Sequence, residues 1–247
     1  MTSTGWPLMD EQELDAIKRR AAQSQQQLNT VRSLLTKNGA PSLRSDFARC
    51  AIDLACEHHS AIIRLVLAGE YGSAGALLRP LLEASTTASW LLYAATCDYI
   101  RSLPTSATAG RAPDIPQLDR MLDQLQPWFP DITKLLLALK NKGPAVWLHQ
   151  YTHGGTPQLL RRSSGWNGGA IHYTLMMGDL FGILAAAHET VIVPNADLSE
   201  YVFPRRDELG VEAWAIMQKT DPPPKPPHSL PPIPSTACDG CGPPMGA

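Results

Sequence analysis

Long stretches of good helix formers, with apolar residues at regular spacing and no Gly or Pro, make up most of the chain. Residues 10–37 are rich in Gln, Leu, Arg and Ala, which have high helix propensity, and Asn38-Gly39 then supplies a C-terminal stop. No segment shows the sustained alternation of β-branched residues that is typical of strands. The sequence therefore predicts an all-α bundle of roughly four to six helices. These helices are expected over residues 10–37, 42–70, 73–103, 117–140 with breaks at Pro127 and Pro130, 170–192, and within 196–220.

Proline and glycine also divide the chain into segments. A chain of 247 residues suits one core with additions at its ends. Pro80 predicts a late helix start or a kink, and the composition of residues 104–116 predicts a loop. A dense proline series after residue 220 cannot bury a core. The expected segments are an N-terminal helix (1–40), a helical bundle (41–195), a C-terminal helical segment (196–220) and a disordered Pro-rich tail (221–247).

Composition limits the classes of partner. The net charge of −2 gives no general attraction for a polyanion, and charged residues make up 18% of the chain. So low a charged fraction suggests a covered face, for which a homodimer is the simplest arrangement. The N-terminus does not resemble a signal peptide. The most apolar window, residues 174–194, contains Asp179, His188 and Glu189, which favours a buried bundle helix over a membrane span. We expect a cytoplasmic protein without membrane contact.

A polar stripe runs along the predicted helix over residues 73–103. At 100° per residue, Arg79, Glu83, Thr86 and Trp90 fall opposite an apolar side that includes Leu81. One interpretation is a solvated face carrying a helical ion pair. The other is that Arg79 and Glu83 enter a shared polar groove, because they lie in an apolar run and in the less favourable order for a pair within one helix.

The preceding helix repeats this design. Asp53, Glu57 and Arg64 lie opposite an apolar face on which His59 falls. Because buried polar groups need partners, we expect His59 to be a hydrogen-bonded core residue rather than a ligand.

The segment from Trp147 to Arg162 has the most chemically suggestive pattern. If it is helical, His149 and His153 lie on one face, four residues apart. The pair alone is half of a zinc site, and so is Cys238-x-x-Cys241, so we expect no metal and no cofactor. Imidazole suits proton transfer and guanidinium suits phosphate, so His149, His153, Arg161 and Arg162 match the needs of phosphodiester chemistry. The alternative is a glycine-rich loop anchored by hydrogen bonds from these side chains.

Two stretches together resemble a known group of proteins. His58-His-Ser-Ala-Ile and Gly72-Ser-Ala-Gly-Ala-Leu-Leu-Arg-Pro-Leu-Leu-Glu-Ala, with the later His-Gly-Gly segment, are similar to uncharacterised bacterial helical families. Those families resemble the HEPN-like superfamily, and the likeness covers residues 46–192. It implies a helical bundle that binds RNA or nucleotides, or cleaves RNA without a metal, in a toxin or phage-defence setting. The Arg followed four to six residues later by His that marks the ribonuclease members does not occur here.

Two hypotheses follow. In the first, a HEPN-like protein binds or cleaves RNA or nucleotides, with Arg79, Arg161 and Arg162 holding phosphate, Glu83 orienting a neighbour, and His149 or His153 transferring protons. In the second, the same residues are structural, and the chain is a noncatalytic helical module that dimerises or holds a partner.

Overall fold

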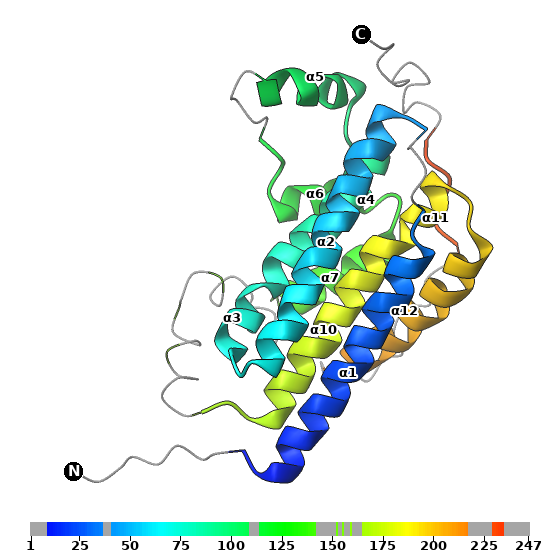
Figure 1. The fold of residues 1–247 in the computed structure, drawn as a ribbon. Coiled ribbons are helices and arrows are strands. Elements are labelled where there is room, and N and C mark those ends of the chain that lie inside the picture. The colour runs from blue at the N-terminus through cyan, green and yellow to red at the C-terminus, as the bar shows by residue number, and fades with distance from the viewer. Residues whose placement is uncertain are drawn as a thin grey trace.

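The computed structural model describes residues 9–36, 41–108, 114–141, 152, 155, 159, 165–216 and 229–234. This part of the chain is all-α and contains no strand, as the sequence predicts (Figure 1). The helices are α1 (Glu11–Leu34), α2 (Leu43–Leu67), α3 (Tyr71–Ala76), α4 (Leu78–Tyr93), α5 (Cys97–Thr108), α6 (Leu118–Leu125), α7 (Pro130–Asn141), α10 (Gly168–Ala187), α11 (Glu189–Ile192) and α12 (Ala196–Ile216).

Side-chain caps set the beginnings of the long helices. Asp10, Ser42 and Asn167 precede α1, α2 and α10, and each side chain accepts a hydrogen bond from the backbone N–H three residues later. Such a cap satisfies one of the four N–H groups that a helix start leaves without a partner. The starts expected from the sequence are confirmed to within about two residues.

The helix predicted over residues 73–103 is divided into three. A turn at Leu77 separates α3 from α4, so that Pro80 lies in the first turn of α4, where a missing N–H costs nothing. The expected late start is confirmed. The loop predicted from residue 104 is wrong for residues 104–108, because α5 continues through Pro104 to Thr108. A proline removes one backbone hydrogen bond without always ending the helix.

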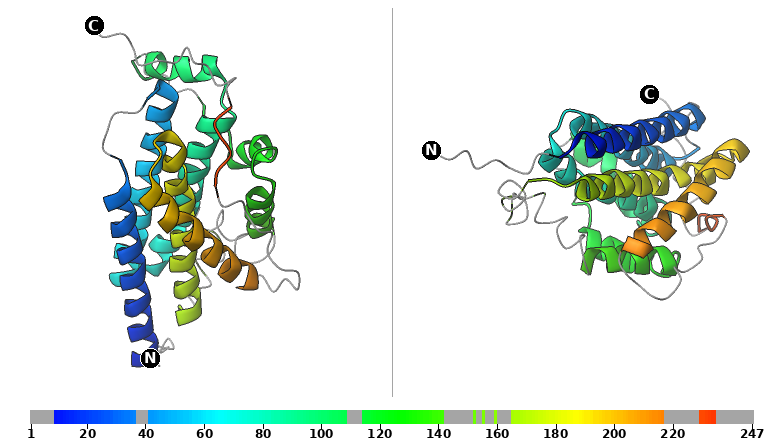
Figure 2. Two further views of the ribbon diagram at one scale, coloured as in Figure 1. Left: turned by 90° about the vertical axis from the view of Figure 1, so that its right-hand side faces the viewer. Right: turned by 90° about the horizontal axis from the view of Figure 1, so that it is seen from below.

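The centre of the bundle is α10. It contacts α1, α2, α4 and α12, and fifteen of its twenty residues are buried (Figures 1 and 2). The segment Gly168–Ile192 is long and apolar enough to cross a membrane, but 89% of its most apolar window is buried inside the protein. A helix that is apolar on all sides is enclosed by its neighbours.

The far side of α4 is covered rather than solvated. Trp90 and Thr86 are 4% and 3% exposed, so the prediction that the stripe from Arg79 to Trp90 is one polar face is wrong for its second half. The reason is α6, which packs on α4; the indole Nε1 of Trp90 donates to Gln124 Oε1 at 2.6 Å. Helical periodicity alone cannot show that two opposite faces of a helix are covered.

A buried carboxylate joins three helices. Asp179 on α10 is 0% exposed; its Oδ2 lies 2.5 Å from Arg20 Nη2 on α1 and its Oδ1 lies 2.8 Å from His59 Nε2 on α2. Ser24 donates a further hydrogen bond to Oδ2 at 3.0 Å. Burial alone would raise the pKa of Asp179, but His59 and Arg20 outweigh it and lower the pKa. The expectation that His59 is a hydrogen-bonded core residue is confirmed.

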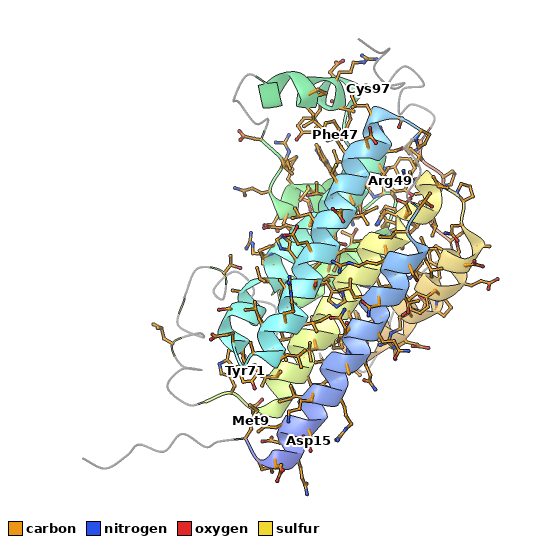
Figure 3. The ribbon with its side chains drawn as sticks, viewed as in Figure 1. Met9, Asp15, Phe47, Arg49, Tyr71 and Cys97 are labelled. Atoms are coloured by element: carbon orange, nitrogen blue, oxygen red, sulfur yellow. The ribbon has the colours of Figure 1, made fainter. Side chains whose placement is uncertain are left out.

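Two further polar links tie the outer elements to this core. Gln27 on α1 donates to the carbonyl of Asp179 at 3.1 Å and accepts from Arg205 Nε on α12 at 2.8 Å. Arg49 on α2 holds the carboxylate of Glu189 on α11 through two nitrogens, at 3.0 and 2.5 Å. Figure 3 shows Arg49 on the side of α2 that faces α11. Paired geometry of this kind is favourable for a buried carboxylate.

The ring of His59 lies in a slot between two glycines of α10. A Cβ added to Gly178 would lie 3.5 Å from His59 Cδ2, and one added to Gly182 would lie 2.7 Å from His59 Nδ1. The second distance is shorter than any ordinary contact, so a hydrogen at Gly182 is what lets the imidazole reach Asp179.

Part of the expected disordered tail packs on the bundle. Leu230 is 8% exposed and belongs to the hydrophobic core, and the hydroxyl of Tyr93 donates to the carbonyl of Pro231 at 2.8 Å. We refer to residues 229–234 as the strap; Figure 2 shows it in red.

We expect Gly182→Ala to lower the free energy of unfolding by about 1–2 kcal/mol, because overpacking against His59 exceeds the gain in helix propensity. Gly210→Ala on α12 is the matched control, since nothing lies within 4 Å of its added Cβ, and it should raise stability by about 0.5–1 kcal/mol. Urea unfolding measures both. A Gly182→Ala protein as stable as the wild type would contradict the slot.

Candidate functional site

An open cleft lies between α2, α4, α5 and the start of α6. Its volume is about 560 Å³, and most of its lining is apolar. Figure 3 shows Phe47 on the side of α2 that faces α5. Leu54 and Ile115, which are 45% and 53% exposed, also line the cleft. A concave, mostly apolar surface of this size is typical of sites for small molecules.

A few polar groups interrupt the apolar lining: Glu83 and Thr87 on α4, His58 on α2, and Tyr99 on α5. Partial burial lowers the pKa of His58, although the charge of Glu57 opposes this, so the imidazole is neutral at pH 7. Burial, reinforced by Asp114, raises the pKa of Tyr99, whose hydroxyl therefore keeps its proton and has no hydrogen-bond partner within the described structure. The cleft thus combines apolar walls with one carboxylate and two neutral ring groups.

Arg79 and Glu83, both nominated by the sequence, contact each other. Arg79 Nε donates to Glu83 Oε1 at 2.8 Å, and the two side chains are 25% and 40% exposed. The pair forms despite its less favourable order along the helix. Because Glu83 also lines the cleft, the pair lies at a partly enclosed edge of it rather than on a fully solvated face.

The other nominated residues, His149, His153, Arg161 and Arg162, lie outside the part of the chain that the structure describes. Between the two histidines, Thr152 is described. Its hydroxyl donates to the carbonyl of Ala76, at the end of α3, at 3.3 Å. Ala76 precedes Arg79 by less than one helical turn, so this hydrogen bond ties Thr152 to the region of the Arg79–Glu83 pair.

A second constellation, which the sequence analysis missed, is enclosed between α4 and α10. Ser89 Oγ lies 2.9 Å from His188 Nε2, and His188 Nδ1 lies 2.7 Å from the carbonyl of Leu184. A carbonyl only accepts, so Nδ1 carries the proton and Nε2 accepts from the hydroxyl of Ser89. A cavity of about 30 Å³ adjoins them, lined also by Thr86, Arg206 and Leu230.

Ser89, His188 and the carbonyl of Leu184 are arranged like a nucleophile, a base and an orienting group. The basicity of His188, however, does not suit that role. Burial lowers the pKa of His188 to about 4, with the charge of Arg206 acting in the same direction and the backbone groups of Leu184 and Ala185 opposing it. So weak a base does not activate a serine at neutral pH. Ser89 and His188 therefore form a neutral hydrogen-bonded pair beside a small cavity.

Within the described residues no group of three or more His, Cys, Asp or Glu side chains could hold a metal ion. His149 and His153 lie outside those residues.

Comparison with known proteins places the chain in a family. The model of a family of unknown function, DUF6988, matches residues 52–208, which is more than half of the chain. The chain belongs to the DUF6988 family. No curated protein and no solved structure matches it. The residues matched to the DUF6988 model include the Arg79–Glu83 pair, Asp179 and the Ser89–His188 pair, whereas α1 and the strap lie outside them.

The sequence of this DUF6988 protein does mark the buried polar residues, because ionisable side chains are rare in apolar segments. Asp179, His188 and Glu189 stand within an apolar window, and each of them is buried and paired. Their partners, however, lie far away in the chain. Ser89 is 99 positions from His188, Arg49 is 140 positions from Glu189, and Ser24 is 155 positions from Asp179. Such pairings follow from helix packing, which periodicity does not reveal.

We expect the stability of this DUF6988 protein to fall as pH drops from 6.5 towards 4. Unfolding restores the ordinary pKa of His188, so as the pH falls the unfolded chain binds a proton before the folded one does. The contribution of neutral His188 to stability is therefore fully present above pH 6.5 and is lost below it. Between pH 7 and 5 this group alone costs about 2 kcal/mol, within the limit of about 1.4 kcal/mol per pH unit.

Urea unfolding of the wild type and His188→Gln at both pH values measures this contribution as the difference between their pH dependences. His172→Gln is the matched control, because His172 is an exposed histidine and its removal should leave the pH dependence unchanged. Equal slopes for the wild type and His188→Gln would rule out the buried neutral imidazole.

Proposed function

We propose that this DUF6988 protein is a HEPN-like module that binds a nucleotide, or one unstacked base of an RNA, in the cleft between α2, α4 and α5. The observation that carries the proposal is that Glu83, which is paired with Arg79, lines a cleft of about 560 Å³ with apolar walls. A nucleotide offers a flat apolar ring, N–H donors on its edge and an anionic phosphate. The cleft offers a surface and an acceptor, and Arg79, held next to Glu83, offers a guanidinium.

Each part of the ligand has a counterpart in the cleft. The ring of Tyr99 and the aliphatic side chains provide the contact area on which a base would stack or pack. Glu83 Oε atoms accept hydrogen bonds, which favours a base with neighbouring N–H donors, such as guanine. Arg79 supplies the positive charge for the phosphate, as a guanidinium suits oxyanions.

The charges beside the cleft favour a short ligand over a long strand. A depression that shares Ile115 to Gln117 with the cleft is lined by three carboxylates and one guanidinium: Asp114, Asp119, Asp123 and Arg120. Carboxylates in this position repel a polyanion, in agreement with the net charge of −2. One phosphate contact predicts a weak dependence on salt, with a slope of about −0.7 in a plot of log affinity against log salt concentration.

We expect guanosine monophosphate to bind more tightly than uridine monophosphate, and Arg79→Ala and Glu83→Gln each to weaken its binding by about tenfold or more, the scale of one charged hydrogen bond. Arg101→Ala and Glu57→Gln are matched controls, because both side chains are exposed and neither lines the cleft. Isothermal titration calorimetry measures all five proteins. Absence of binding by the wild type, or equal affinities throughout, would refute the nucleotide site.

Catalysis is tested in the same series with labelled RNA in the presence of a chelator. In the proposal, His149 or His153 transfers protons and Arg161 and Arg162 hold the RNA. Cleavage by the wild type that is lost in His153→Ala or His149→Ala would support the catalytic role. Binding without cleavage would assign the noncatalytic role.

A second candidate function is homodimerisation, and exposed apolar residues at the cleft favour it. Leu54 and Ile115 project from the α2 and α6 sides of the cleft while remaining about half exposed. Together with the charged fraction of 18%, they support a second copy covering this edge.

We expect Leu54→Asp to shift the protein towards the monomer, because a buried interface position does not accept an unpaired charge. Val211→Asp on α12 is the matched control, being 53% exposed but outside the cleft. Sedimentation velocity across a concentration series reports the change. A wild type that is monomeric at all concentrations would exclude this function.

A further inference from the structure

The cavity beside Ser89 and His188 is lined by a buried hydroxyl that lacks a hydrogen-bond partner within the described structure. Thr86 is 3% exposed, and its hydroxyl has no hydrogen-bond partner within the described structure. An unpaired buried hydroxyl is destabilising unless something in the cavity pairs with it. The hydroxyl of Thr86 therefore points to an occupant with a hydrogen-bonding oxygen.

The charge around the cavity has one sign. Arg206 is the charged residue among the described residues that line it, and no Asp or Glu lines it among them. Arg206 donates to Asp207 through Nε at 3.0 Å, but Asp207 is itself partly exposed and does not line the cavity. With His188 neutral, the potential inside the cavity is set by the guanidinium, which favours a negatively charged group.

The rest of the lining is apolar. Leu122, Leu125 and Phe129 close one side and Leu184 another. The site therefore suits a molecule with a small anionic head and a short hydrocarbon body. As it stands, the cavity of about 30 Å³ has room for little more than water, so a larger occupant must displace something.

Leu230 of the strap is the residue to be displaced. It lines the cavity although it lies far along the chain from α4 and α10, and it is held there by its own packing and by the Tyr93–Pro231 hydrogen bond at 2.8 Å. Its four-carbon side chain is a hydrocarbon group of the kind that the apolar part of the site accepts. A short surface segment can open locally without unfolding the bundle that it covers.

We propose that this cavity is a binding site for a short-chain monocarboxylate, whose carboxylate pairs with Thr86 near Arg206 and whose hydrocarbon body replaces Leu230. The site is separate from the cleft proposed for a nucleotide, since the described residues that line the two share no member. Binding requires the strap to leave the cavity, so its affinity is reduced by the fraction of time for which the strap is closed.

The test uses the full-length protein with butyrate, and with n-butylamine as a probe of equal length and opposite charge, followed by ligand-observed NMR titration. We expect butyrate to bind and n-butylamine not to bind. Thr86→Val, which keeps the shape of the side chain, should weaken butyrate binding about tenfold. Leu230→Ala should tighten it several-fold because the cavity is then open more often.

Val211→Ala on α12 is the control for Leu230→Ala, because Val211 is exposed and does not line the cavity. Circular dichroism of each variant shows whether the bundle remains folded. The proposal is overturned if Leu230→Ala binds neither probe, if it binds both equally, or if Thr86→Val binds butyrate as tightly as the wild type does. Saturable butyrate binding that depends on Thr86 and increases on removal of Leu230 supports it.

Discussion

The fold depends on a carboxylate that has no contact with water. Asp179 is 0% exposed at the middle of the most buried helix, where an unpaired charge would cost several kcal/mol. Arg20, Ser24 and His59 compensate it from two other helices. These hydrogen bonds and ion pairs form only when α1, α2 and α10 are in one register. The network therefore selects one packing of the three helices among the many that hydrophobic contact alone would allow.

The sequence was sufficient for the positions of most long helices and for the apolar face of α2, but not for the second covered face of α4. Local signals, such as the caps at Asp10 and Ser42 and the apolar face of α2, act over a few residues and can be read without the fold. The loop expected at residues 104–108 failed because proline marks a weak point in a helix rather than a certain end. The burial of Leu230 was missed because a proline series says nothing about what a single leucine within it contacts.

The candidate sites were predictable only in part, and for a similar reason. Helical spacing places Arg79 beside Glu83, and the structure confirms their contact. The same reasoning put Thr86 and Trp90 on that polar face, where α6 in fact covers them. Ser89 lies on α4 and His188 lies 99 positions later, in the turn between α10 and α11, so their hydrogen bond exists only once α4 lies against the end of α10. The two sites also differ in size, since one is an open cleft of about 560 Å³ and the other is a cavity of about 30 Å³ that Leu230 of the strap helps to line.

The aspartate at the centre of α10 also has a consequence for how the chain is made. By length and composition Gly168–Ile192 passes as a transmembrane segment, and during synthesis it is exposed before α12 exists to cover it. A carboxylate at the middle of such a segment opposes its transfer into lipid by about 3 kcal/mol. Asp179 thus lowers the tendency of this segment to enter lipid, while in the folded protein Arg20 and His59, both earlier in the chain, hold the same carboxylate in the interior.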